Sequence, residues 1–228
     1  MVRYAIYFMP AESSALAAFG ASAIGYCAAS GRDVPLPDSP FHRRADAMAL
    51  TEEPRRYGFH GTLKAPFELA SGRTEAELLD AARNFVRGRS PFSVPAMTVK
   101  ALSRFVALVP AAHSAELAEL AGDCVTAFEP FRAPLTDADL ARRLKAPLSE
   151  PQRAYLAQWG YPYVFDEFRF HMTLSGPIED DAVRSEAASS LASLYAPIDQ
   201  PMPVDAITIE VQPARDQRFR VLERIAFG

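Results

Sequence analysis

The feature that most constrains the fold of this chain is a short segment that occurs twice. Residues 59–66 read FHGTLKAP and residues 170–177 read FHMTLSGP, so Phe, His, Thr, Leu and Pro stand at the same offsets in both copies. The two copies hold two of the four histidines in the chain. Internal repeats are the signature of duplicated supersecondary units. The repeat therefore predicts two similar units, each opened by a strand with the pattern His-x-Thr-Leu.

A similar succession of elements is expected after each copy. Periodicity, capping residues and the positions of glycine and proline predict the order strand, helix, strand, strand twice, in repeat lobes over about 57–110 and about 168–227. The expected elements are a strand at 57–66, a helix at 74–87 and strands at 92–102 and 104–109 in the first copy, and a strand at 167–175, a helix at 180–195 and strands at 204–211 and 218–227 in the second.

Two further stretches lie outside the repeat. Residues 3–9 are expected to form a strand, followed by a helix to about residue 28 that Ser13 or Ser14 caps. The segment of about 113–160 predicts a helical insert between the two copies. Its expected helices cover 114–128, begin after Thr136, and run from Ser149 to about 160. We therefore expect an α+β fold in which residues 1–228 form a single domain.

The composition favours a small substrate over a long nucleic acid. The chain has 228 residues, of which 49% are hydrophobic, so it is long enough to bury a sizeable core. Its formal net charge is −4. Proteins that bind along a nucleic-acid backbone usually have a basic surface. A small phosphorylated molecule held by a few local groups is therefore the expected ligand, and nucleic acid is not the expected one.

The cysteines and the apolar segments point to the cytoplasm. Cys27 and Cys124 lie in alanine-rich segments and form no Cys-x-x-Cys pair, so two free thiols in a reducing compartment are expected. The most apolar stretch, 15–29, is too short to span a bilayer. The segment before it contains Pro10 and Glu12 and lacks the basic flank of a signal peptide. We expect a cytoplasmic protein that makes no membrane contact.

The alternation of side chains along a strand sorts the repeated residues by face. His60, Thr62 and Lys64 fall on one face, while the apolar Phe59 and Leu63 fall on the other. In the second copy, one face carries Arg169, His171, Thr173 and Ser175. A histidine and a threonine two residues apart lie about 7 Å from each other along a strand. If the copies pack around a pseudo-two-fold axis, two imidazoles and two hydroxyls meet in one cleft.

These residue types suit the hydrolysis of a phosphoester or the opening of a cyclic phosphate. The reaction needs a base for the attacking water and an acid for the departing oxygen, and imidazole serves in either role near neutral pH. Hydroxyls and cations meet the charge on the phosphate oxygens. The expected catalytic residues are His60 and His171. The expected phosphate-binding residues are Thr62, Thr173, Lys64, Ser175 and Arg169.

No metal or other cofactor is expected, because no carboxylate stands at metal-ligand spacing beside either histidine. The sequence does not decide which histidine is the acid and which the base. Tyr4, Tyr7 and Arg104 are candidates to line the cleft from neighbouring strands, but their facing is open. The remaining residues of interest are read as structural or exposed, namely His42, His113, Trp159, Tyr161 and Tyr163.

At the two His-x-Thr motifs the chain resembles the two-histidine (2H) phosphoesterase superfamily, which includes LigT-like proteins and cyclic nucleotide phosphodiesterases. The segments PRRYGFHGTLKAPF, FRAPL, WGYPYVFDEFRFHMTLSGP and VQP are similar to a bacterial family of phosphonate-metabolism proteins associated with carbon–phosphorus lyase genes. The resemblance implies a LigT-like bilobal fold with two pseudo-symmetric antiparallel sheets, flanked by helices around a central cleft. Its context implies a cyclic phosphate of a ribose phosphate as substrate.

The residues leave two alternatives open. One is an enzyme acting on RNA ends, either a 2′,3′-cyclic phosphodiesterase or a 2′-5′ RNA ligase-like protein. The other is a module that binds a phosphorylated metabolite without turning it over. The sequence also leaves open the oligomeric state and the role of the insert at about 113–160, which small members of the superfamily lack.

Overall fold

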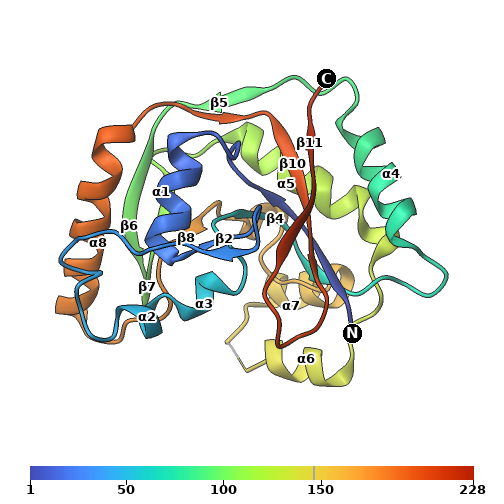
Figure 1. Ribbon diagram of the computed structural model, residues 1–228. Helices are drawn as coiled ribbons and strands as arrows, with labels where there is room; N and C mark the ends of the chain where they lie inside the picture. The colour runs from blue at the N-terminus through green and yellow to red at the C-terminus, as the bar shows by residue number, and fades with distance from the viewer. Residues whose placement is uncertain (146) are drawn as a thin grey trace.

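A seven-stranded antiparallel sheet with helices packed around it forms the body of the molecule in the computed structural model, which describes residues 1–145 and 147–228 (Figure 1). The strand order in the sheet is β11-β10-β1-β4-β8-β7-β6, and β2–β3 and β5–β9 form two small ribbons. The strands are β1 (Arg3–Phe8), β2 (Tyr26–Cys27), β3 (Arg32–Asp33), β4 (Gly61–Phe67), β5 (Phe92–Val94), β6 (Met97–Leu102), β7 (Phe105–Pro110), β8 (Met172–Thr173), β9 (Met202–Val204), β10 (Ala206–Gln212) and β11 (Arg220–Ala226).

The helices begin and end where local capping chemistry dictates. Ser14, Thr74 and Ser149 each accept a backbone N–H at the start of a helix. Gly25 has a φ of 78° and ends the first helix before residue 28, where the sequence predicted its end. The helices are α1 (Ala15–Ile24), α2 (Ala47–Leu50), α3 (Glu52–Arg55), α4 (Glu75–Val86), α5 (Ala115–Ala127), α6 (Asp137–Arg143), α7 (Glu150–Trp159) and α8 (Asp181–Tyr195), with short 3-10 turns at Glu129–Phe131, Phe165–Glu167 and Ala196–Ile198.

The two copies of the repeat interlock. Each contains a strand, a helix, a short strand and two longer strands, which are β4-α4-β5-β6-β7 and β8-α8-β9-β10-β11. The short strands β5 and β9 pair with each other. Helix α4 packs against β10 and β11, while α8 packs against β6 and β7, so the helix of each copy covers strands of the other (Figure 1). Each copy therefore buries its apolar surface only in the presence of its counterpart.

One continuous sheet replaces the two separate sheets that the resemblance implied. Strands β4 and β8 join the halves through a single residue pair, Gly61 with Met172. Strand β8 is also much shorter than the strand predicted at 167–175. The carbonyl of Val106 accepts the amides of both Leu174 and Ser175, so regular pairing with β7 stops there.

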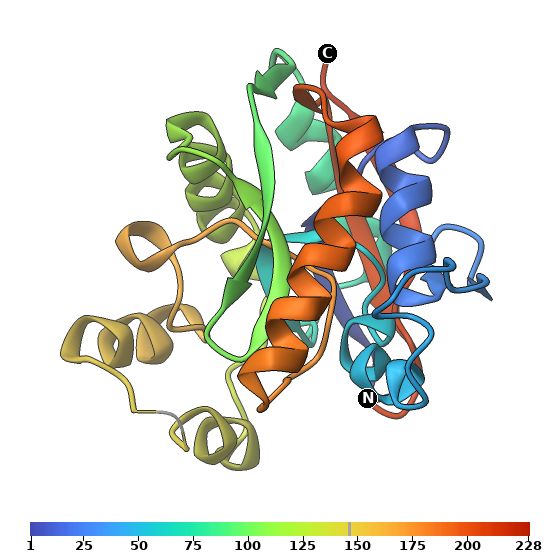
Figure 2. The same cartoon turned by 90° about the vertical axis from the view of Figure 1, so that its left-hand side faces the viewer.

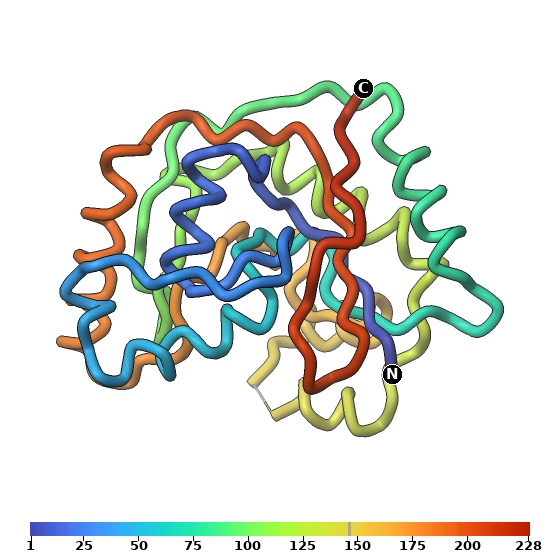
Figure 3. Tube along the Cα trace, viewed as in Figure 1, coloured from blue at the N-terminus to red at the C-terminus, as the bar shows by residue number. Residues whose placement is uncertain are grey.

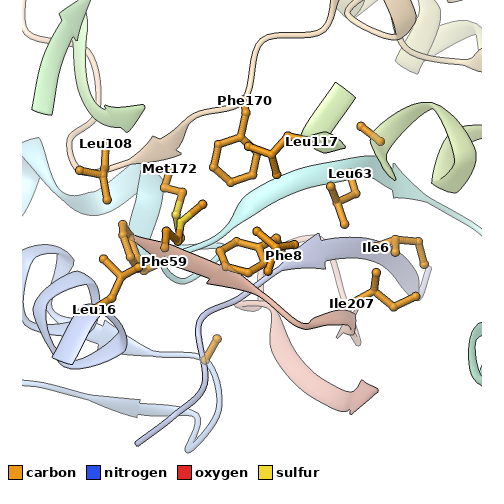
Figure 4. Packing of buried hydrophobic residues seen from close by; sticks show 14 of the residues in the cluster. Ile6, Phe8, Leu16, Phe59, Leu63, Leu108, Leu117, Phe170, Met172 and Ile207 are labelled. Atoms are coloured by element: carbon orange, nitrogen blue, oxygen red, sulfur yellow. The ribbon is translucent and has the colours of Figure 1, made fainter. Parts of the chain in front are cut away.

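The apolar side chains of the two motifs belong to one core. Phe59 and Leu63 from the first copy, and Phe170 and Met172 from the second, are all at most 8% exposed. Figure 4 shows them gathered around Phe8 of β1. The rings of Phe8 and Phe170 lie 6.0 Å apart in a tilted arrangement. Burial of these residues directs the polar residues between them to the opposite face.

Helices α5, α6 and α7 lie close to the helices predicted between the two copies. Helix α5 packs against β4, whereas α6 and α7 stand out from the body of the molecule (Figure 2). The C-terminus lies at the top of the molecule and the N-terminus in its lower part in both orientations (Figures 2 and 3). Among the described residues, none of the helices combines the length and the apolar character needed to cross a membrane.

Candidate active site

The structure brings His60, Thr62, His171 and Thr173 to the wall of one cavity with a volume of about 540 Å³. Their strands, β4 and β8, are neighbours in the sheet and pair at Gly61 and Met172. Continuing that antiparallel pairing by one residue on either side places Thr62 opposite His171 and His60 opposite Thr173. Diagonal neighbours across such strands lie about 7–8 Å apart. The two imidazoles therefore line the same cavity, close enough for His171 to lower the pKa of His60.

Both imidazoles are anchored in the same way. Nδ1 of His60 lies 2.9 Å from the carbonyl oxygen of Gly58, and Nδ1 of His171 lies 2.8 Å from that of Arg169. In each case the partner is the carbonyl two residues earlier in the chain. A carbonyl only accepts hydrogen bonds, so each Nδ1 carries the proton and donates it, which assigns the tautomer. In the neutral form of such a ring Nε2 is the proton acceptor, and in His60 it accepts from the Thr62 hydroxyl.

His60 lies against the rings of two tyrosines. Its ring stacks on Tyr7 of β1, with centroids 3.8 Å apart and an interplanar angle of 24°, and its Nε2 lies 3.2 Å from Oγ1 of Thr62. Tyr57 approaches the ring at 5.9 Å. Burial lowers the pKa of His60 to about 4; the carbonyl of Gly58 opposes this shift and the nearby His171 adds to it. His60 is therefore neutral at physiological pH.

Lys64 does not reach the cavity, contrary to the prediction. Tyr7 pairs with Thr62 and Ile6 pairs with Lys64, so β4 has two residues where β1 has one. Such an irregularity breaks the alternation of side chains. The Lys64 ammonium is buried instead against α5, where it donates to the carbonyl of Val125 and to the carboxylate of Glu129, both at 2.8 Å. Lys64 therefore forms an ion pair with Glu129 in this structure and lies outside the cavity that holds the histidines.

Ser175 and Arg169 also depart from the prediction. Ser175 lines the cavity, but its hydroxyl accepts the amide of Val106 at 2.9 Å and donates to the carbonyl of Gly176 at 3.0 Å. Its single proton is therefore used within the backbone. Arg169 precedes β8, is exposed, and donates to the carbonyls of Asp166 and Phe168. It is absent from the lining of the cavity that holds both histidines, but it lines a neighbouring pocket together with His171 and Thr62.

The structure also gives the positions of several residues that the sequence left open or predicted differently. Tyr7 and Arg104 line the cavity, whereas Tyr4 is in the main core. Tyr161 lines the cavity although the sequence favoured a core position. His42 is buried, not a surface residue, because its ring nitrogens bond to the Ser39 hydroxyl and the Ala23 carbonyl. The cavity residues missed in the sequence include Arg3, Glu53, Tyr57, Arg142 and Arg143.

The cavity is positively charged in an otherwise acidic protein. Arg3, Arg104, Arg142 and Arg143 line it, and Glu53 is the one carboxylate among its described lining residues. Clefts lined by one sign of charge concentrate ligands of the opposite sign. No alternation or motif marked these arginines in the sequence, because they come from a loop, the first strand and the insert. The cavity is thus suited to an anion.

Glu210 is a buried carboxyl beneath the site. Its residue pairs with Ala5 across β10 and β1, and neither carboxyl oxygen has a hydrogen-bond partner among the described residues. Burial raises the pKa of Glu210 well above its usual value of 4.5. The folded state therefore binds a proton that the unfolded state releases. The stability from this proton is full below the unfolded pKa and is lost as the pH rises through the folded one.

We expect Glu210→Gln to stabilise the fold increasingly with pH. The amide has the same shape but never ionises, so the variant avoids a cost of about 1.4 kcal/mol for each unit by which the carboxyl pKa is raised. Urea unfolding from about pH 4.5 to about pH 8 measures the difference between the variant and the parent. A difference that does not change across this range would show that Glu210 is ionised in the folded protein.

The described residues contain no group of three or more His, Cys, Asp or Glu side chains placed to hold a metal ion. The donors that converge on the cavity are imidazoles, hydroxyls and guanidiniums. Guanidinium groups do not ligate metals, and only the two histidines are good ligands for a transition metal. The arrangement is suited to binding and proton transfer around an anionic group.

Comparison with known proteins gives the family but no established activity. Residues 62–220 match the family described as "Protein of unknown function (DUF1045)". The chain is 39% identical over its whole length to a protein of Janthinobacterium sp. (strain Marseille) named "Ribose 1,5-bisphosphate phosphokinase PhnN", of which the match covers 51%. A protein of the same name from Laribacter hongkongensis (strain HLHK9) is 31% identical over 96% of this chain and 50% of its own length.

The chain thus spans about half the length of the curated relatives it matches. Their names apply to the whole of those proteins, and about half of each lies outside the match to this chain. The family match is of a different kind, because it extends over well over half of the residues present here and includes His171 and both threonines of the motifs. On that match, the chain belongs to the family of proteins of unknown function DUF1045.

Proposed function

We propose that this protein is a metal-independent phosphoesterase that hydrolyses a cyclic phosphate of a small sugar phosphate or nucleotide. The observation that carries the proposal is the matched pair of imidazoles, each anchored through Nδ1 and each lining the same cavity beside a threonine. A positioned base and a positioned acid about one phosphate apart are what the opening of a phosphodiester needs. The rest of the cavity supplies donors and positive charge.

The proposed reaction removes one proton from the attacking water, adds one proton to the departing oxygen, and replaces one bond between phosphorus and oxygen with another. His60, neutral because burial lowers its pKa to about 4, accepts a proton through Nε2 from the attacking water. The water oxygen bonds to phosphorus as the bond from phosphorus to one ring oxygen breaks. His171 starts protonated and donates its Nε2 proton to that departing alkoxide. The products are a phosphomonoester and a hydroxyl, and the proton on His60 returns to His171 through solvent.

Thr62 and Thr173 are the proposed donors to the non-bridging oxygens, and substrate binding replaces the hydrogen bond that the Thr62 hydroxyl donates to Nε2 of His60 in the free protein. Each lies two residues from a histidine and opposite the other histidine, so the two hydroxyls flank the position of the phosphate. Donors at fixed positions stabilise charge that grows in the transition state without having to reorganise. No step requires a metal, because the proton transfers and the charge stabilisation use the side chains of the chain itself.

The names of the curated relatives support a small phosphorylated sugar as substrate. Both are named for activity on ribose 1,5-bisphosphate. This chain contains no G-x-x-x-x-G-K-[ST] segment, the phosphate-binding loop of many nucleotide-dependent kinases, so the phosphokinase activity is not proposed for it. Together with the resemblance to phosphonate-metabolism proteins, the names favour a cyclic phosphate of a phosphorylated ribose, handled in that metabolism.

A competition between substrates tests the proposal. The purified chain is offered ribose cyclic phosphates, nucleoside 2′,3′-cyclic phosphates and a short RNA ending in a cyclic phosphate, at several salt concentrations. We expect a ribose cyclic phosphate to be preferred, with a shallow salt dependence, because only a few contacts to phosphate form. A strong preference for RNA that collapses with salt, with a slope of roughly −0.7 for each phosphate contacted, would assign the protein to RNA ends instead.

The pH dependence tests the role of His60. If His60 is the base, kcat/KM for a cyclic phosphate is expected to fall on the acid side with a midpoint near pH 4, because the free protein loses activity only when the ring becomes protonated. An ordinary histidine would give a midpoint near about 6.5. An acid limb at that higher value would mean that a solvent-exposed histidine, and not His60, accepts the proton.

A further inference from the structure

Two arginines of the cavity have no carboxylate partner among the described residues. Arg104 pairs with Glu179 at 2.7 Å and Arg142 pairs with Asp139 at 2.6 Å. Arg3 bonds only to the neutral amide of Gln212, with its Nε 2.8 Å from the amide oxygen. Arg143 makes no ion pair, and its buried Nε lacks any hydrogen-bond partner in the part of the chain that the structure describes.

These two arginines lie in the same part of the cavity. Arg3, Arg143 and Tyr161 also line a smaller cavity that adjoins the larger one. The guanidinium of Arg143 sits over the Tyr161 ring at 5.1 Å from its centroid. Burial lowers the pKa of Arg143; the charges of Arg142 and Arg3 add to this shift, while Tyr161 and the Asp139 carboxylate oppose it. Two partly buried cations that make no direct ion pair within the described residues raise the free energy of the empty site, and a bound anion lowers it.

The arginine pair is separated from the histidine pair. Arg3 and Tyr7 share one face of β1, and four residues of strand span about 13 Å. Tyr7 stacks on His60, so the backbone of Arg3 lies at the end of the cavity away from His60. A phosphate between the two histidines and an anion at Arg3 and Arg143 would therefore be different groups. A pocket of about 540 Å³ is in the range that holds a whole small ligand.

We propose that Arg3 and Arg143 form a second anion subsite, which binds a phosphomonoester on the same small molecule whose cyclic phosphate lies between His60 and His171. The identity of that molecule rests on the proposed function, but the anion subsite does not. Guanidinium groups match the oxygens of a phosphate through paired hydrogen bonds. Arg143 is the last residue of α6, so the helical insert completes the subsite. The insert thereby selects substrates that carry two phosphates.

Kinetics with a matched pair of substrates test the subsite. The pair is a ribose cyclic phosphate with a phosphomonoester at the 5 position and the same compound without it. We expect Arg143→Gln to raise KM for the doubly phosphorylated compound about 10- to 100-fold, the effect of losing a charge-assisted contact, with little change in kcat. KM for the singly phosphorylated compound should stay unchanged, and Arg143→Lys should restore part of the affinity.

The control is Arg153→Gln, which removes an exposed arginine of α7 in the same insert, outside the cavity residues described. It should leave both KM values at those of the parent. Equal changes for both substrates in Arg143→Gln, or a change in kcat alone, would overturn the subsite. Circular dichroism and thermal unfolding identify a variant that has lost its fold. If Arg143→Gln does not fold, the KM values of Arg143→Lys are compared with those of the parent instead.

Binding of inorganic phosphate tests the subsite without turnover. Calorimetry should show that the His60→Ala variant still binds phosphate, whereas Arg143→Gln binds it at least about tenfold more weakly. If no cyclic phosphate is hydrolysed but this pattern holds, the proposed function fails and the anion subsite stands. If Arg143→Gln binds phosphate as well as the parent does, the subsite fails whatever the activity of the protein.

Discussion

Replacement of either His60 or His171 by alanine is expected to lower kcat for a cyclic phosphate by about 10²- to 10⁴-fold, the usual contribution of a positioned base or acid. Both rings are fixed by an Nδ1 hydrogen bond to a backbone carbonyl, so their Nε2 atoms are already placed before substrate binds. Alanine removes the proton acceptor or donor and leaves the strand unchanged. Steady-state rates of the two single variants and the parent measure the effect.

The double variant distinguishes joint catalysis from two separate effects. Because the two groups act in one transition state, the loss in His60→Ala/His171→Ala should be far smaller than the product of the single losses. Thr62→Val should act more mildly, since it removes one donor only. The control is His113→Ala, which changes an exposed histidine outside the cavity and should retain the parent rate. Full activity in either single variant would contradict the assigned roles.

Gly61→Ala is expected to destabilise the protein by about 1–3 kcal/mol, the usual cost of an overpacked site. A Cβ atom at this position would lie 2.4 Å from two ring carbons of Phe170. Gly61 is also the residue through which β4 pairs with β8, so the strain falls between the two histidine motifs. Thermal unfolding should show a decrease in Tm of about 2–12 °C for a chain of this length. The rate should fall as well, because the spacing of the imidazoles changes.

The contact with Phe170 makes this prediction specific. Phe170→Leu removes the ring that the new methyl group meets, so the double variant Gly61→Ala/Phe170→Leu should be more stable than the sum of the single effects predicts. Gly122→Ala is the matched control, since its Cβ would meet Phe165 at an ordinary 3.4 Å inside helix α5. That change should stabilise the helix by up to about 1 kcal/mol. Additive effects at Gly61 and Phe170 would show that the close approach is not what requires glycine.

The sequence predicted those parts of the site that depend on local alternation. The alternation of side chains along a strand predicted His60 and Thr62 on one face and Phe59 and Leu63 on the other. In the structure, His60 and Thr62 line the cavity, while Phe59 and Leu63 are buried in the core. The same alternation predicted the wrong face for Lys64, because the register between β4 and β1 shifts by one residue between Thr62 and Lys64. Such an irregularity arises from pairing with a distant strand, and the residues of one strand alone do not reveal it.

The arginine side of the cavity depends on tertiary placement. The sequence predicted helix α6 and its cap at Thr136, but the position of a helix relative to the sheet is set by long-range packing. Arg143 reaches the cavity only because α6 lies beside β1 and Tyr161. The joining of the two halves into one sheet likewise depends on a single pair of distant residues. Neither feature leaves a periodic signal in the chain.

Hydrolysis of a cyclic phosphate in water enriched in oxygen-18 tests two-histidine catalysis most directly. Phosphorus NMR follows the conversion of a five-membered cyclic phosphodiester of ribose to the monoester, with a chelator present throughout. We expect the parent protein to form a monoester that carries one oxygen-18 atom on phosphorus, and His60→Ala/His171→Ala to form almost none. No conversion of any cyclic phosphate by the parent, or equal conversion by the double variant, would contradict the proposed catalysis.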